Sequence, residues 1–209
     1  MEIQYYGANC VRLSTKKASI IVDDNLAKLG QKSVTKSGDI VLMTIPQDST
    51  GKAEPKIIID MPGEYEVSNT SIQGVAARSH VDEAGKKSAT MFKVIADEVK
   101  TVVVGHVYPE LNDEQLEALG TVDVLIIPVG GNGYTLDSIG ALKLIKKIEP
   151  KLIIPTHYED KALKYEVPQQ PLEEALKGLA MEPKETVPKL KIRAGELGET
   201  TQLIVLERQ

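Results

Sequence analysis

The sequence predicts a mixed α/β domain whose first half consists mainly of β-strands. Short apolar runs separated by turns fill residues 3–104, and amphipathic segments alternate with apolar runs from residue 112 onward. No linker or low-complexity tract divides the 209 residues. We therefore expect residues 1–209 to form a single domain around one continuous core.

The strands of the first half are predicted from β-like runs bounded by turn residues. Residues 40–45 are almost entirely apolar, which is typical of a strand buried on both faces, and Pro46 ends this run. Cys10 falls in an early strand and is expected in the core. The other strands predicted in this half span residues 3–6, 10–14, 19–22, 57–59, 64–67, 71–77, 89–96 and 101–104.

The second half predicts three helices, at residues 112–120, 137–148 and 171–179. The first has Asn112 or Asp113 as N-cap and ends at Gly120. The second carries apolar residues at helical spacing, which predicts a buried face made of Ile139, Leu142, Ile145 and Ile148. The strands of this half are expected at residues 124–128, 152–155, 190–192 and 202–206.

Composition excludes several classes of protein. The 25 basic and 30 acidic side chains give a net charge of −5, which disfavours a protein that binds duplex nucleic acid by neutralising phosphates. No apolar run is long enough to cross a membrane, and the first residues lack the pattern of a signal peptide. Cys10 is the only cysteine, so neither an intrachain disulfide nor a cysteine-rich zinc site is expected. We expect a cytoplasmic protein.

The chain has only three histidines, His80, His106 and His157, and each follows a predicted strand. Functional groups of α/β sheets gather outside the carboxyl ends of the strands. Imidazole binds zinc and related metals, so the three histidines are candidate ligands of one divalent ion. Other polar side chains at comparable positions are candidate supporting residues: Asp23, Asp48 and Tyr134.

Four stretches, residues 20–23, 61–67, 113–131 and 148–158, carry a resemblance to a known family. In them the sequence resembles the metallo-β-lactamase superfamily, and more narrowly the single-domain Zn-dependent hydrolases of the ascorbate-phosphate lactonase-like branch. The resemblance implies a four-layer αββα sandwich, in which two sheets pack face to face, helices lie outside and the site lies at one edge.

The metal motif of that superfamily matches poorly. Its members carry a T-H-x-H-x-D-H signature after the strand that corresponds to residues 40–43. Thr44 is kept here, but the signature's ligand positions hold Ile45, Gln47, Ser49 and Thr50. The remaining ligand positions correspond to His80, to His106 in place of a bridging Asp, and to His157, and Asp23 matches the strand-end Asp that supports the site. The resemblance thus implies that the scaffold is kept and the dinuclear centre is lost.

Two main hypotheses for function follow. The first is a non-hydrolytic binding or structural protein with a degenerate site, whose partner is a small molecule or a protein and which needs no metal. The alternative is a mononuclear metal-dependent hydrolase that uses His80, His106 and His157 with one zinc or another divalent metal. Metal-free acid–base chemistry by Asp48 or Glu64 is a third interpretation.

Overall fold

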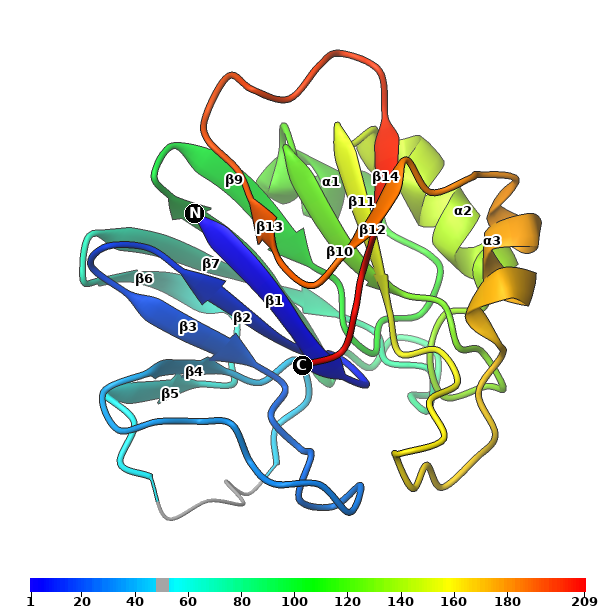
Figure 1. Ribbon diagram of the computed structural model, residues 1–209, viewed down its shortest axis with the longest axis horizontal. Helices are drawn as coiled ribbons and strands as arrows, with labels where there is room; N and C mark the ends of the chain where they lie inside the picture. The colour runs from blue at the N-terminus through cyan, green and yellow to red at the C-terminus, as the bar shows by residue number, and fades with distance from the viewer. Residues whose placement is uncertain (48–52) are drawn as a thin grey trace.

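The computed structural model describes residues 1–47 and 53–209, which form two β-sheets packed face to face (Figure 1). The first sheet has six strands in the order β13 (Leu190–Lys191), β1 (Glu2–Gly7), β2 (Cys10–Ser14), β3 (Ser19–Val22), β4 (Ile40–Leu42) and β5 (Ile57–Ile59). Strands β3, β4 and β5 run parallel, so their carboxyl ends lie at the same edge of the sheet.

The second sheet has eight strands in the order β12 (Glu185–Val187), β14 (Gln202–Leu206), β11 (Leu152–Thr156), β10 (Val124–Pro128), β9 (Val99–Val103), β8 (Ala89–Ala96), β7 (Thr70–Ala77) and β6 (Gly63–Val67). The five strands from β12 to β9 are parallel, whereas β8, β7 and β6 are antiparallel to their neighbours.

The core between the sheets is almost entirely aliphatic. It is filled by buried side chains such as Leu13 and Ile20 from the first sheet and Ile126 and Ile154 from the second, with Phe92 among them. A second apolar layer joins the eight-stranded sheet to the helices α1 (Asp113–Leu119), α2 (Ser138–Ile148) and α3 (Leu172–Leu179).

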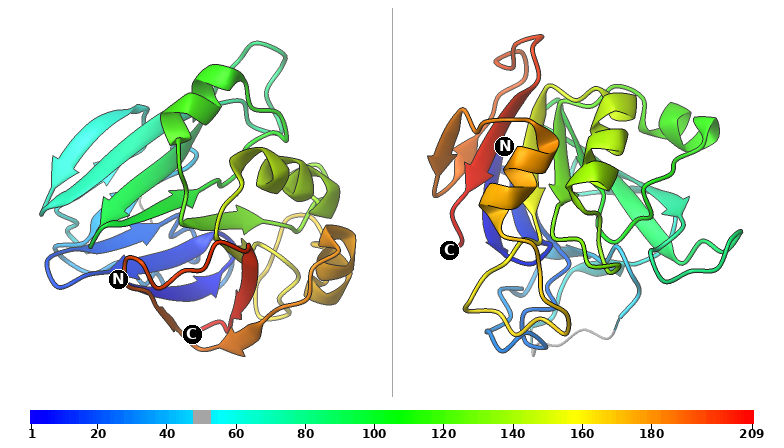
Figure 2. Two further views of the ribbon diagram at one scale, coloured as in Figure 1. Left: turned by 90° about the horizontal axis from the view of Figure 1, so that it is seen from above. Right: turned by 90° about the vertical axis from the view of Figure 1, so that its right-hand side faces the viewer.

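The structure confirms the predicted sandwich of the metallo-β-lactamase type. Seen from above, the helices lie outside the eight-stranded sheet (Figure 2). In the part of the chain that the structure describes, the outer face of the six-stranded sheet is covered by loop side chains instead. Leu26 and Leu29 from the loop after β3 pack there with Leu163 from the loop after β11.

Local hydrogen bonds explain where the helices begin. The Asn112 side chain accepts a hydrogen bond from the Gln115 amide at 2.9 Å, and the Gln115 side chain accepts one from the Asn112 amide at 2.9 Å. This reciprocal capping box confirms Asn112 as the N-cap of α1. Asp137 caps α2 by accepting from the Gly140 amide at 2.7 Å.

The predicted buried face of α2 is partly wrong. Ile139 is 64% exposed, and the buried apolar residues are Ala141, Leu144, Ile145 and Ile148. These four positions follow the i, i+3, i+4, i+7 pattern, and Ile139 lies two residues before Ala141, on the opposite side of the helix.

Several strand ends differ from the prediction by one or two residues, one predicted strand is shorter still, and one strand was missed. The strand expected over residues 40–45 ends at Leu42, because the Thr44 amide donates to the Asp23 side chain at 2.7 Å and not to a neighbouring strand. The three-residue strand β12 was not predicted, and its sequence Glu-Thr-Val has little apolar character. Cys10 is buried, as expected. Among the described residues, none of the helices has the length and apolarity needed to span a bilayer.

We expect the chain to fold without metal. Its core consists of packed aliphatic side chains from both sheets, and burial of such surface contributes about 25 cal/mol per Å² without any ion. Dialysis against a chelator should therefore leave the far-UV circular dichroism and the thermal midpoint unchanged. A global loss of the dichroism signal that zinc restores would contradict this expectation, because domains held by a structural metal unfold when it is removed.

Candidate functional site

Five buried polar residues gather where the parallel strands end. Asp23 directly follows β3, Thr44 lies two residues past β4, His106 three past β9 and His157 directly after β11. Asn9 lies in the turn between β1 and β2. Each of the five is less than 5% exposed, so the cluster is shielded from water and joins the edges of both sheets.

Asp23 is fully engaged by Thr44. The Thr44 amide donates to one carboxylate oxygen at 2.7 Å, and its hydroxyl donates to the other at 2.6 Å. Burial raises the pKa of Asp23 to about 6, although both hydrogen bonds from Thr44 favour the charged form. The backbone of Asp23 is left-handed, with φ of 48°, a conformation that Asp adopts more easily than most residues. Asp23 therefore holds the end of β4 in place.

His106 lies at the centre of the cluster. Its Nδ1 and Nε2 atoms lie 3.4 and 3.5 Å from Nδ2 of the Asn9 side chain, and Nδ1 also lies 3.5 Å from the Thr44 hydroxyl oxygen. These distances are long for hydrogen bonds. Asn9 is itself oriented by the Thr156 hydroxyl, which donates to its Oδ1 at 3.1 Å. Burial, with smaller effects of the nearby His157 and His80, lowers the pKa of His106 to about 3, so the ring is neutral at neutral pH.

The hydrogen bond with Gln169 fixes the tautomer of His157. The Gln169 amide nitrogen donates to the Val167 carbonyl at 2.9 Å, which turns its Oε1 toward His157 Nδ1 at a distance of 3.0 Å. Because that oxygen only accepts, Nδ1 carries the hydrogen and Nε2 keeps its lone pair. Burial lowers the pKa of His157 to about 4, against the effect of the Gln169 hydrogen bond.

Aromatic rings surround the two histidines. The rings of His106 and His157 meet edge to face with centroids 5.4 Å apart. The Tyr134 ring centroid lies 5.3 Å from that of His106 and 6.2 Å from that of His157. The Tyr165 ring centroid lies 5.2 Å from that of His157. Tyr134 is 38% exposed, so its ring connects the buried cluster with the surface.

His80 lies beside this cluster. Its ring is 5.7 Å from that of Tyr108, and the backbone of His106 lies close enough to raise its pKa. Burial lowers the pKa of His80, and the backbone contact acts in the opposite direction. Its Nδ1 is buried and, among the described residues, has no hydrogen-bond partner. The three histidines are thus neighbours, and the rings of His106 and His157 are in contact.

The described residues do not fit a metal centre as they are placed. Among them, no group of three or more His, Cys, Asp or Glu side chains is arranged to hold an ion. Asp23 accepts from Thr44 with both oxygens, whereas His157 keeps the lone pair of Nε2 free. The metal-binding role of His80, His106 and His157 therefore stays a prediction.

The supporting residues predicted from the sequence have different outcomes. Asp23 and Tyr134 lie in the cluster, whereas Asp48 lies outside the described residues. Sequence reasoning missed Asn9 and Gln169, which contact the two central histidines. The position of Asn9 in a turn between two predicted strands was a weak indication that it lies near the site. No feature of the sequence indicated Gln169.

Gly130, which follows β10, allows two loops to pack against each other at the site. A Cβ atom at this position would lie 1.9 Å from the His157 carbonyl oxygen and 2.2 Å from the Gln169 side-chain oxygen. The Gly130 carbonyl also accepts from the Gln170 amide at 2.8 Å. Only glycine leaves room for this approach.

Comparison with known proteins places the chain in a family. The family model described as "Beta-lactamase superfamily domain" matches residues 2–157, which is most of the chain. The chain belongs to the β-lactamase superfamily. This confirms the superfamily and the Zn-dependent hydrolase-like branch that the sequence predicted.

Solved structures match nearly the whole chain. A candidate Zn-dependent hydrolase of the metallo-β-lactamase superfamily from Thermotoga maritima is 25% identical with a TM-score of 0.79, covering 99% of this chain and 98% of that one. A candidate metal-dependent hydrolase from Parabacteroides distasonis is 15% identical with a TM-score of 0.64, covering 99% of this chain and 93% of that one. At this identity the match supports the similarity of fold alone.

Curated relatives match over a short segment only. A metal-dependent hydrolase from Carboxydothermus hydrogenoformans is 44% identical over 43 residues, which are 21% of this chain and 19% of that protein. A metal-dependent hydrolase from Thermoplasma acidophilum is 40% identical over 48 residues, which are 22% of this chain and 21% of that protein. The match spans about a fifth of the length of these relatives.

Proposed function

We propose that this superfamily member has a degenerate metal site and acts as a binding or structural protein, not as a dinuclear hydrolase. The observation that carries the proposal is the internal pairing of the site. Both Asp23 oxygens accept from Thr44. The carboxylate that matches the family's supporting Asp is thereby satisfied within the protein and needs no ion.

The residues at the signature positions also support the proposal. Ile45 has no atom that can bind a metal, and Gln47 is a poor zinc ligand beside histidine. A metal-bound hydroxide is what lets such hydrolases attack their substrates near neutral pH. Without the ions the same scaffold has no such nucleophile.

The proposed ligand is a small polar molecule that enters beside Tyr134. This ring is partly exposed and contacts both central histidines. Neutral imidazole, amide and phenol groups suit an uncharged, hydrogen-bonding ligand. A protein partner remains the alternative occupant, and we propose a cytoplasmic location from the single cysteine.

The proposal predicts no metal-dependent hydrolysis. Protein purified without a histidine tag and supplemented with zinc or manganese should show no turnover above buffer on phosphodiester, lactone and β-lactam substrates. The His157→Ala variant serves as the matched control, since it should give the same baseline. Turnover that a chelator abolishes and that His157→Ala lacks would overturn the proposal.

One observation favours a second function, a mononuclear metal-dependent hydrolase. The buried Nδ1 of His80 has no partner among the described residues, and His80 contacts the backbone of His106. In this alternative, His80, His106 and His157 would hold one zinc or similar ion, which would act as a Lewis acid. A zinc titration separates the two functions: affinity lost in all three His→Ala variants supports the alternative, and weak binding unchanged in the variants supports the binding protein.

A further inference from the structure

A positively charged depression lies beside the N-terminal end of α1, apart from the histidine cluster. It has a cavity volume of about 550 Å³. Four basic side chains line it, Arg78, Lys86, Lys87 and Lys147, with Glu110 as the single carboxylate of the lining. The excess of positive charge is local, because the whole chain carries a net charge of −5.

Neutral groups hold two of these cations in place. The Arg78 guanidinium donates to the Asp82 carbonyl through Nε at 3.2 Å and Nη2 at 3.1 Å, and it lies 4.0 Å above the Tyr108 ring. Lys147 Nζ donates to the Leu111 carbonyl at 3.1 Å. Carbonyls and a ring orient the cations but do not neutralise their charge, so the charge remains available to a ligand.

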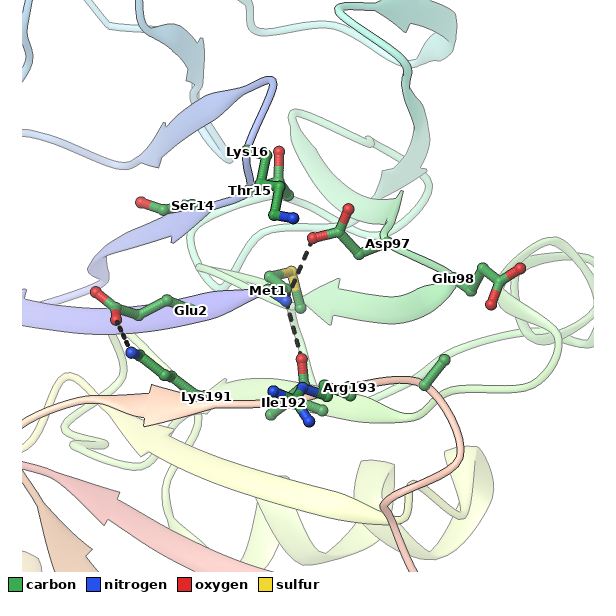
Figure 3. Close-up of a pocket in the computed structure, with 11 residues that line it drawn as sticks. Met1, Glu2, Ser14, Thr15, Lys16, Asp97, Glu98, Lys191, Ile192 and Arg193 are labelled. Carbon is green, nitrogen blue, oxygen red and sulfur yellow. Dashed lines mark hydrogen bonds and ion pairs between the residues drawn. The ribbon is translucent and has the colours of Figure 1, made fainter.

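A groove beside the start of β1 provides the contrast (Figure 3). Three of its cations lie near carboxylates: Lys191 at 3.8 Å from Glu2, the Met1 amine at 3.4 Å from Asp97 and Arg193 at 3.7 Å from Glu196. Lys16 makes no ion pair among the described residues. In the depression beside α1, only Lys86 lies near a carboxylate, that of Asp82 at 3.8 Å. Across residues 1–47 and 53–209, Arg78, Lys87 and Lys147 make no ion pair.

We propose that the depression beside α1 binds a small molecule through a diphosphate or similar phosphoanion. The planar guanidinium of Arg78 can bind two phosphate oxygens at once, and the lysines add point charges around it. The cavity volume falls within the range of small-molecule sites, about 300–1,000 Å³. This inference does not depend on whether the histidine cluster binds a metal.

The depression connects to the histidine cluster through Tyr108. Arg78 packs on one side of this ring, and the ring of His80 lies 5.7 Å from it. A phosphoanion held by Arg78 therefore sits one side chain away from His80. The imidazole NMR signals of His80 give a local readout of binding that affinity alone does not provide.

Calorimetric titration of the full chain with inorganic pyrophosphate, in about 0.15 M salt, tests the proposal. We expect saturable binding with one ligand per chain and a shift of the His80 signals. Lys87→Gln and Lys147→Gln should each weaken binding about fivefold or more, because each removes a charge-assisted hydrogen bond. Glu110→Gln should tighten binding, since it removes the opposing carboxylate.

Lys146→Gln is the matched control, because it makes the same change of charge on the same helix outside the depression, and it should bind like the wild type. A nucleoside diphosphate that binds more tightly than pyrophosphate would support the site and identify a nucleotide as the ligand, and equal affinity would identify the diphosphate group alone. No saturable binding, or equal weakening by Lys146→Gln and Lys147→Gln, would overturn the proposal.

Discussion

Gly130→Ala should lower the free energy of unfolding by about 3 kcal/mol, at the upper end of the cost of overpacking a buried site. The added methyl group would lie 1.9 Å from the His157 carbonyl oxygen and 2.2 Å from the Gln169 side-chain oxygen. The carbonyl belongs to the backbone, so it cannot move aside as a flexible side chain would. Urea unfolding followed by circular dichroism measures the change.

Gly198→Ala is the control for this substitution. A Cβ atom at Gly198 would have no other atom within 4 Å, so the same added methyl should change stability by less than about 0.5 kcal/mol. If Gly130→Ala were as stable as the wild type, the loop after β10 would not approach His157 as described. The hydrogen bond between His157 and Gln169 would then lose its structural basis.

Acid should destabilise the protein well before its exposed carboxylates titrate. The pKa of His106 is lowered to about 3 and that of His157 to about 4, so the folded state keeps both rings neutral where the unfolded chain protonates them. Their contribution to stability is complete above the unfolded pKa of about 6.5 and is lost as the pH falls toward the folded values.

Asp23 acts in the opposite direction. Its pKa is raised to about 6, so the folded state binds a proton that the unfolded chain lacks between roughly pH 4 and 6. Near pH 5 the unfolded chain binds nearly two more protons at the two histidines than the folded state does. The folded state in turn binds nearly one more proton at Asp23 than the unfolded chain does. Together these three groups should lower the free energy of unfolding by about 1.4 kcal/mol for each unit of pH lost.

Asp23→Asn provides the test of this balance. The amide keeps the size of the carboxyl group, and the Thr44 hydroxyl can accept from it. Removing the Asp23 proton should steepen the dependence by about 1 kcal/mol per unit of pH. Urea unfolding between about pH 4.5 and 6.5 measures it, above the range where Asp82, with its pKa lowered to about 2, loses its own contribution. An unchanged slope would show that Asp23 is not protonated in the folded state.

Local patterns predicted the elements of the fold well. Asn112 was one of two N-cap candidates, and its reciprocal hydrogen bonds with Gln115 form within one helical turn. The face of α2 was harder, because Ile139 fits an apolar periodicity equally well and only packing against the sheet decides which side is buried. The arrangement of two sheets came from the resemblance to a family, not from residue patterns.

The site was only partly predictable. Histidines after strands could be expected to meet, because the carboxyl ends of parallel strands share one edge, and the rings of His106 and His157 do meet. Gln169 could not be found in this way. It lies in a loop twelve residues beyond His157, and its role depends on the close approach of Gly130.

The hydrogen bonds of the site also bear on the order of folding. Asn9 lies 97 residues from His106 and 147 from Thr156, and the polar cluster joins the edges of both sheets. Contacts between such distant residues carry a large entropic cost of loop closure, so they form after the local hairpins β1–β2 and β7–β8. We infer that the cluster closes after the rate-limiting step of folding. Substitutions such as Asn9→Ala would then speed unfolding and leave the folding rate nearly unchanged.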